Sequence, residues 1–165
     1  MPNLILIAHN LRSSHNVGSL LRTADGLGVS TVVLSGYTPY PISPDDGRLP
    51  HLARKVDAQI AKTALGAESS VAWQHHEHIE PVIEKLKTDG YAIYGLEQTP
   101  TSMLLPNFRA PAKLAIIVGR EVEGLEDSVV ALCDGCLEIP MLGKKESFNV
   151  VQATAMALYH CRFVV

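Results

Sequence analysis

Residues 114–125 read LAIIVGREVEGL, and this stretch is the clearest indication of the fold class. Residues 114–118 form a continuous apolar run, as expected of a strand that is covered on both faces in a parallel sheet. Gly119 ends the run, and Gly124 precedes a short helix that we predict over residues 125–132. Ligands of open α/β sheets bind beyond the carboxyl ends of such strands, so the turn between the two glycines is a candidate binding loop. Its spacing is not G-x-G-x-x-G, so it does not indicate a dinucleotide site.

Apolar runs of the same kind recur along the chain and alternate with helical patterns. This alternation predicts an α/β protein with a mostly parallel sheet flanked by helices. No internal repeat or linker divides the sequence, so we expect a single domain over residues 1–165. The other predicted strands are residues 4–8, 31–34, 71–73, 91–96 and 137–139.

Three longer helices are predicted from apolar periodicity. The first has apolar residues at i, i+3, i+4 and i+7 from Val17, and the second covers residues 79–89. The third begins near Ser147, a suitable N-cap, and is apolar over most of its circumference. Such a helix is buried on more than one side, and in a short chain a second protomer can supply the second cover. We therefore expect a homodimer.

Composition limits the function classes. Hydrophobic residues make up 47% of the 165 residues and charged residues 19%, the balance of a soluble globular protein. The sequence has no apolar run of the roughly 20 residues that span a bilayer, and no basic stretch opens it, so we expect a cytoplasmic protein without a membrane partner. The net charge is −3, so a nucleic-acid site must be a local basic patch or one completed by a second subunit.

Two clusters have the side chains of a metal site. Cys133 and Cys136 form a C-x-x-C pair, but no second pair of ligands follows them. His75, His76 and His78 lie close together in the sequence without partners at helical spacing, which favours a solvated turn before a helix. We expect neither cluster to bind a metal.

Residues 36–50 contain four prolines and two glycines, so regular structure cannot extend far through them. Long ordered loops in compact domains are often functional. A substrate-binding loop and a mobile surface loop both fit this composition.

Residues 16–24, NVGSLLRTA, form a second stretch of interest. Arg22 falls on the side of the predicted helix opposite the apolar stripe, where it is free to face a ligand or a partner. A solvated surface charge fits the same position. Asn16 likewise fits either a functional group or a simple helix cap.

Residues 139–150, IPMLGKKESFNV, form a third stretch, in which a strand end leads through a basic loop into a helix. Lys144 and Lys145 beside a helix N-terminus favour an anion such as a phosphate. Asn149 in the first helical turn is a candidate hydrogen-bonding group. A solvated loop and an ordinary first turn fit as well.

Together and in this order, the three stretches closely resemble the motifs of the SpoU/TrmH family of SPOUT-class RNA methyltransferases. The family patterns are N-x-G-x-x-x-R-T-A, a strand followed by glycine-glutamate-glycine, and I-P-M-x-G-x-x-x-S-L-N-V. The resemblance spans His9 to about Tyr159. It implies a SPOUT-type sheet with a deep C-terminal trefoil knot, and a dimer with active sites near the subunit interface. Phe148 and Val151 depart from the family pattern, but neither change removes a proposed functional group.

The resemblance also implies a cofactor, a reaction and its residues. The cofactor is S-adenosyl-L-methionine, held in the knot by three loops, and the reaction is methyl transfer to a ribose 2′-hydroxyl of tRNA or rRNA. The implied catalytic residues are Arg22, Asn16, Glu121, Ser147 and Asn149. The cofactor-binding positions are Leu96, Gly119, Ile139, Met141 and Ser147, and the RNA-binding positions are Arg12, Arg22, Arg120, Lys144 and Lys145.

The family assigns proton removal to the arginine at position 22. A guanidinium is always protonated in proteins, so orienting a phosphate or stabilising a developing alkoxide is the alternative role for Arg22. Two other functions stay open: a non-catalytic knotted RNA-binding protein, and a SPOUT enzyme that methylates a base nitrogen. The presence of Arg22, Glu121, Ser147 and Asn149 counts against the non-catalytic function.

Overall fold

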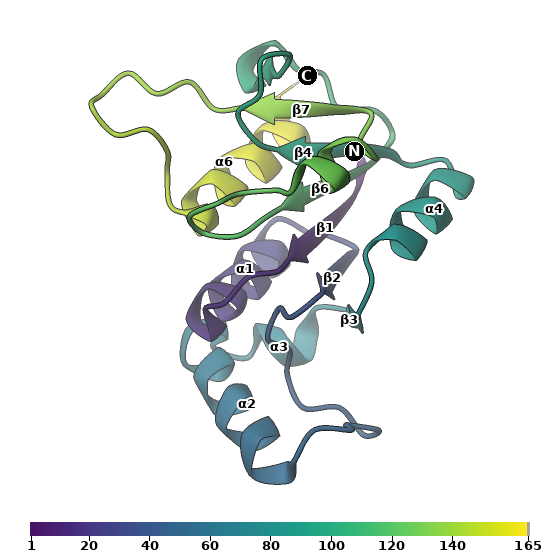
Figure 1. Ribbon diagram of the computed structural model, residues 1–165, viewed down its shortest axis with the longest axis vertical. Helices are drawn as coiled ribbons and strands as arrows, with labels where there is room; N and C mark the ends of the chain where they lie inside the picture. The colour runs from purple at the N-terminus through teal and green to yellow at the C-terminus, as the bar shows by residue number, and fades with distance from the viewer. Residues whose placement is uncertain (165) are drawn as a thin grey trace.

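A seven-stranded sheet, parallel at every pairing, forms the centre of the molecule in the computed structural model, which describes residues 1–164. Its strand order is β3-β2-β1-β6-β4-β7-β5, and Figure 1 labels every strand except β5. Because all strands run in one direction, their carboxyl ends meet at one edge. The strands are β1 (Asn3–His9), β2 (Thr31–Ser35), β3 (Trp73–His76), β4 (Ala92–Leu96), β5 (Met103–Leu104), β6 (Lys113–Val118) and β7 (Gly135–Glu138).

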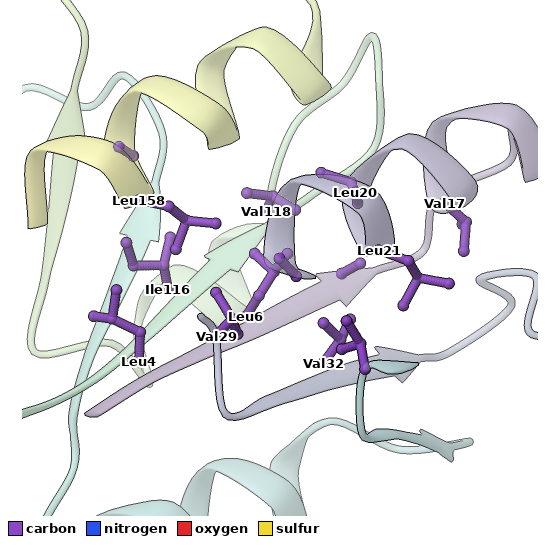
Figure 2. Packing of buried hydrophobic residues seen from close by; sticks show 14 of the residues in the cluster. Leu4, Leu6, Val17, Leu20, Leu21, Val29, Val32, Ile116, Val118 and Leu158 are labelled. Atoms are coloured by element: carbon purple, nitrogen blue, oxygen red, sulfur yellow. The ribbon is translucent and has the colours of Figure 1, made fainter. Parts of the chain in front are cut away.

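Helices cover both faces of this sheet and enclose two separate apolar cores. The larger core lies under α1 (Ser14–Gly26), α2 (Pro50–Ala64), α3 (Ala67–Ser70) and α6 (Val150–Phe163). The smaller core lies under α4 (Glu80–Thr88) and α5 (Asp127–Val130). Figure 2 shows the larger core, where leucines and valines of β1, β2 and β6 meet Leu20, Leu21 and Leu158 of the covering helices.

The structure confirms the predicted α/β class and the predicted parallel sheet. The central strand β6 alternates its side chains between the two cores: Leu114, Ile116 and Val118 enter the larger one, and Ala115 and Ile117 the smaller one. A strand buried on both faces needs apolar residues at every position, and this is why the run at 114–118 was unbroken.

Helix α1 begins at Ser14, earlier than the sequence pattern predicted, and Asn16 is not its N-cap. The Ser13 hydroxyl oxygen accepts a hydrogen bond from the Asn16 backbone N–H at 3.1 Å, which caps the first turn. The predicted apolar stripe is fully buried. Gly18 lies so close to Ile60 and Thr63 of α2 that a Cβ atom there would overlap them, so the glycine of the first motif serves helix packing.

Several predicted boundaries were wrong. The third strand covers residues 73–76 instead of 71–73, because the short helix α3 uses the residues up to Ser70 and its C-cap is Val71. His75 and His76 therefore lie in a strand that pairs with β2, and not in a turn. The helix predicted over residues 125–132 is shorter in the structure, where α5 covers only Asp127–Val130. The Leu125 N–H donates to the Glu97 side chain before the helix begins, and a turn follows Val130.

The last two elements also differ from their predictions. Strand β7 covers residues 135–138 instead of 137–139. The final helix begins at Val150 and not near Ser147, because the Asn149 side-chain oxygen accepts from the Val151 N–H at 2.9 Å and makes Asn149 the N-cap. Ser147 lies in the loop before the helix. The interval between β4 and β6, which was predicted as a loop, contains β5 and the 3₁₀ turn η1 (Leu105–Asn107).

The C-terminal half has the strand arrangement that positions the site. Strand β4 lies between β6 and β7, both of which follow it in the chain. Their carboxyl ends therefore bring together the loops at residues 96–98, 119–124 and 139–149, the three loops that the family resemblance implied. The trefoil knot stays a prediction. Within residues 1–164 no helix is both long and apolar enough to span a membrane.

Candidate functional site

A cleft of about 160 Å³ opens at the carboxyl ends of β4, β6 and β7. We call it the carboxyl-edge cleft. Its walls come from the three loops named above and from the first turn of α6. All five positions that the resemblance implied for cofactor binding line it: Leu96, Gly119, Ile139, Met141 and Ser147.

The loop at residues 119–124 forms one wall of the cleft, and the backbone of the loop requires glycine at both ends. The backbone groups of Arg120 and Gly124 bond to each other in both directions, at 3.2 and 3.1 Å, which closes the loop tightly. Gly124 has φ +70, which glycine adopts readily. A Cβ at Gly119 would lie 2.6 Å from the Gly124 carbonyl carbon. The absence of a side chain at Gly119 is therefore required by the chain's own backbone, and its role in cofactor binding stays a prediction.

Glu97 fixes this loop and was missed by the sequence analysis. Its side-chain oxygens accept from the Leu125 N–H at 2.7 Å and from the Gln98 N–H at 3.0 Å. Gln98 in turn donates to the Glu146 carbonyl oxygen at 3.0 Å, which ties the loop after β4 to the loop before α6. The signal was present, because Glu97 is the first residue after an apolar run that ends at the ligand-binding edge.

Glu121 connects the cleft to the first motif. Its carboxylate accepts from the backbone N–H groups of Ser13 at 3.1 Å and Arg12 at 3.3 Å, and from the Asn16 side-chain amide at 3.2 Å. Partial burial opposes the ionisation of Glu121, but these hydrogen bonds and its own backbone N–H outweigh burial, so the pKa of this carboxyl is lowered. The predicted pair Asn16 and Glu121 is therefore in direct contact.

Glu126 makes a second connection, which sequence reasoning did not find. Its carboxylate meets the His9 Nε2 atom at 3.2 Å and accepts from the Asn10 amide at 3.1 Å. His9 is buried, and its Nδ1 atom lies 2.9 Å from the Ser35 hydroxyl oxygen. His9 is the last residue of β1 and Asn10 follows it, so the position of these two residues at the carboxyl edge was the available signal.

Arg22 does not line the carboxyl-edge cleft of its own chain. It is exposed, and among residues 1–164 it forms no hydrogen bond or ion pair. It stands six residues after Asn16, and six steps on an α-helix place two side chains about 120° apart around the axis. Asn16 therefore faces the cleft loop, and Arg22 points to another side of α1.

The other predicted residues fall into two groups. Ser147 lines the cleft, and the Asn149 oxygen caps α6, so only the Asn149 amide group is left to donate to a ligand. Lys144 and Lys145 are fully on the surface of the 139–149 loop. Arg12 is exposed and lies 3.6 Å from Glu123, and Arg120 is part-buried, 3.8 Å from Glu126. Arg12 and Arg120 thus have carboxylates nearby, and the role of the five predicted cations in RNA binding stays a prediction.

The charge of the cleft favours a cationic ligand. Four carboxylates line it, from Glu97, Glu121, Glu123 and Glu138, against one cation, Arg120. Apolar side chains form the rest of the wall, including Leu96, Val118 and Ile139. A flat apolar group with an attached positive charge would find both kinds of partner here.

The cysteines do not make a reactive site. Burial raises the pKa of the Cys133 thiol to about 12, and burial also raises the pKa of Cys136. Thiolates are the nucleophilic and metal-binding form, so this environment suppresses both chemistries at neutral pH. Among the described residues, no three His, Cys, Asp or Glu side chains lie close enough together to hold a metal ion.

These features define a parallel α/β protein with a ligand cleft across the carboxyl ends of its C-terminal strands. Residues 3–159 match the sequence profile of the SpoU rRNA Methylase family. The chain belongs to this family.

Curated relatives resemble the chain over most of its length. The tRNA (guanosine(18)-2′-O)-methyltransferase of Borreliella burgdorferi is 27% identical over 157 residues, which cover 94% of this chain and 64% of the relative. The chain spans 56% of the length of TrmH family relatives from Staphylococcus aureus. It is thus similar to about half to two thirds of each of these proteins.

Solved structures share the fold. An rRNA methyltransferase from Sinorhizobium meliloti, solved with bound AdoMet, superposes with a TM-score of 0.81 at 19% identity, over 97% of this chain and 56% of that one. The TrmH/SpoU tRNA modifying enzyme of A. aeolicus superposes with a TM-score of 0.79 at 21% identity, over 98% and 75%.

Proposed function

We propose that this chain transfers a methyl group from S-adenosyl-L-methionine to a ribose 2′-hydroxyl of a structured RNA, tRNA or rRNA. The observation that carries the proposal is the carboxyl-edge cleft, which gathers all five cofactor positions of the family motif. Family membership supports it, and so does a relative named for 2′-O-methylation of tRNA.

The cleft fits the cofactor by the chemistry of its walls. S-adenosyl-L-methionine combines a flat adenine with a positively charged sulfonium, and it supplies an electrophilic methyl group when bound. Leu96, Ile139 and Met141 offer apolar contact to the adenine. Glu97 and Glu138 offer negative charge, while the backbone at Gly119 and Ser147 offers hydrogen-bonding groups.

The protein's own residues divide the remaining tasks. Asn16 and Glu121 fix the start of α1 against the cleft loop, so the helix that carries Arg22 has one orientation. Ser147 lines the cleft, and Asn149, which caps α6 two residues later, keeps a free amide group; both can hold the ribose hydroxyl by hydrogen bonds. Because positioning supplies much of the rate in a transfer of this type, rigid support of these groups is itself catalytic.

Arg22 needs a second chain for its proposed role. It lies outside the cleft of its own chain, so we propose that it acts at the cleft of a partner subunit in a homodimer. There its planar guanidinium would orient an RNA phosphate or stabilise the developing alkoxide. The half-buried face of α6, with Val151, Ala155, Met156 and the exposed Tyr159 and Phe163, is the proposed dimer surface.

The experiment is mass spectrometry of RNA nucleosides from cells with and without this protein. Loss of one 2′-O-methylated nucleoside, mapped by resistance to alkaline cleavage, is the expected result, because the modified ribose lacks the attacking hydroxyl. Loss of a base-methylated nucleoside would instead establish the base-nitrogen alternative. An unchanged set of modifications, together with RNA binding by the purified protein, would establish the non-catalytic alternative.

A further inference from the structure

The charge of the chain is unevenly distributed along the sequence. Residues 1–66 carry six Lys and Arg against four Asp and Glu, whereas residues 67–165 carry eight against thirteen. The overall charge of −3 therefore conceals a basic N-terminal part. An electrostatic footprint for RNA has to be sought in this part.

Helix α2 concentrates that positive charge on one side. Ala53, Ile60 and Ala64 are buried and face the rest of the protein. His51, Arg54, Lys55 and Lys62 are all exposed. With 3.6 residues per turn, His51, Lys55 and Lys62 lie on the side opposite the buried one, and Arg54 lies on the flank of the helix between the two sides. We call these four positions the α2 basic face.

The cations of the α2 basic face are not neutralised by the protein. Within residues 1–164, Arg54, Lys55 and Lys62 form no ion pair and no side-chain hydrogen bond. The nearby acids have other partners, since Asp57 accepts from the Ile42 N–H at 2.8 Å and Asp46 binds Arg48. The basic face is thus available to an external anion.

The loop before α2 is built to hold the helix in place. Arg48 donates to the carbonyl oxygens of Tyr40 at 2.9 Å and Pro41 at 3.1 Å, and its guanidinium lies 3.6 Å from the centroid of the Tyr40 ring. Tyr40 stacks on His75 of β3 with centroids 3.9 Å apart. These contacts tie residues 40–48 to one another and to β3, and a substrate-binding role for residues 36–50 stays a prediction.

The location of α2 relates it to the proposed reaction. The loop at residues 36–50 leaves the carboxyl end of β2, which is the sheet edge at which the cleft opens, and leads into α2. Gly18 packs α1 against α2, and Arg22 lies one helical turn after Gly18. In Figure 1, α2 lies at one end of the long axis, beside α1, and away from β7.

We propose that the α2 basic face is a docking surface for the phosphate backbone of the substrate RNA, which it delivers towards Arg22. The inference rests on the proposed function and adds a surface that the family motifs do not contain. Exposed, unpaired cations spaced along a helix suit sequence-independent phosphate contacts. In the dimer, the face would flank the cleft to which Arg22 contributes.

The test compares two double variants of the full-length protein. Arg54→Ala/Lys55→Ala removes two cations from the α2 basic face. Lys85→Ala/Lys87→Ala removes two cations from α4, which covers the opposite face of the sheet, and is the matched control. Alanine is compatible with both helices, and circular dichroism checks that each variant is folded. The probe is total tRNA, and separately total rRNA, from cells that lack the protein.

Fluorescence anisotropy over a range of salt concentrations gives the first result. The α2 variant is expected to bind RNA about tenfold more weakly at low salt, and to reduce the slope of log affinity against log salt by about two, one for each lost phosphate contact. The control variant should match the wild type in both quantities. Affinity for S-adenosyl-L-methionine, measured by calorimetry, should be the same for all three proteins.

Two outcomes would overturn the inference. One is equal RNA affinity and salt slope for the α2 variant and the control, which would leave the proposed function intact if the wild type still methylates RNA. The other is charge-dependent binding of wild-type protein to phosphatidylglycerol vesicles without binding to either RNA. If the wild-type protein binds RNA through α2 but does not transfer a methyl group, the proposed function is refuted and the docking surface is not.

Discussion

At the scale of residues, two carboxylates hold the ends of one cleft loop. Glu121 binds the start of α1, and Glu126 binds His9 and Asn10 at the end of β1. Glu121 could be predicted because it belongs to the family motif. Glu126 could not, since its contact with His9, 117 positions away, depends on which strands become neighbours. Such contacts follow from the sheet order and not from local spacing.

Replacing Glu121 with glutamine tests the first of these contacts. The variant keeps one acceptor oxygen but loses the charge, so we expect the free energy of unfolding to fall by about 1 kcal/mol at pH 7. Because the pKa of Glu121 is lowered on folding, its stabilisation is present above the ordinary value of 4.5 and is lost as the pH falls through the folded-state pKa. Urea titrations at pH 7 and at acidic pH should show that the difference in free energy of unfolding between the variant and the wild type becomes smaller at acidic pH. A difference independent of pH would contradict this role.

Gly119 makes a second prediction at this scale. An added Cβ would lie 2.6 Å from the Gly124 carbonyl carbon and 2.7 Å from the Leu125 nitrogen, so backbone must move to admit it. We expect Gly119→Ala to cost about 1–3 kcal/mol of stability and to weaken cofactor binding. Gly143→Ala, where a Cβ would meet only open space, is the matched control. Denaturant midpoints and calorimetry measure both effects, and equal midpoints for the two variants would refute the steric account.

At the scale of elements, the apolar runs predicted the strands well because each buried strand needs apolar residues on both faces. Boundaries were predicted less well where side chains, and not periodicity, end an element. Asn149 and not Ser147 caps α6, because its side-chain oxygen is the one that reaches the free N–H of the first turn. Helix α2 was not predicted at all, because its basic and apolar residues follow a proline-rich stretch that dominated the local pattern.

The surface of α6 leads to a prediction about assembly. Tyr159 and Phe163 are about half exposed, with ring centroids 5.0 Å apart, and they continue a half-buried apolar face. We expect light scattering at micromolar concentration to give twice the chain mass of 17.9 kDa. Tyr159→Glu/Phe163→Glu should shift the mass to the monomer and abolish methyl transfer, because Arg22 would no longer reach a cleft. The control Tyr37→Glu changes an exposed aromatic residue outside α6 and should stay dimeric.

At the scale of the whole molecule, negative and positive charge lie in different parts of the chain. The C-terminal strands and their loops form an acidic cleft, and the N-terminal helices carry Arg22 and the α2 basic face. The net charge of the whole chain gave no indication of an RNA site, because it is the sum of an acidic region and a basic region. The order of the strands in the sheet could not be predicted from local sequence patterns either. Strand β4 lies between β6 and β7, which both follow it in the sequence.

The most direct test of the account is methyl transfer by the purified protein. Isotope-labelled S-adenosyl-L-methionine is incubated with RNA from cells lacking the protein, and the nucleosides are identified by mass spectrometry. We expect label in a single 2′-O-methylated nucleoside with wild-type protein, and almost none with Arg22→Lys, which binds the cofactor normally but has lost the planar guanidinium. Full activity of Arg22→Lys would remove the special role of that guanidinium. No label in ribose with folded, RNA-binding wild-type protein would contradict the central claim.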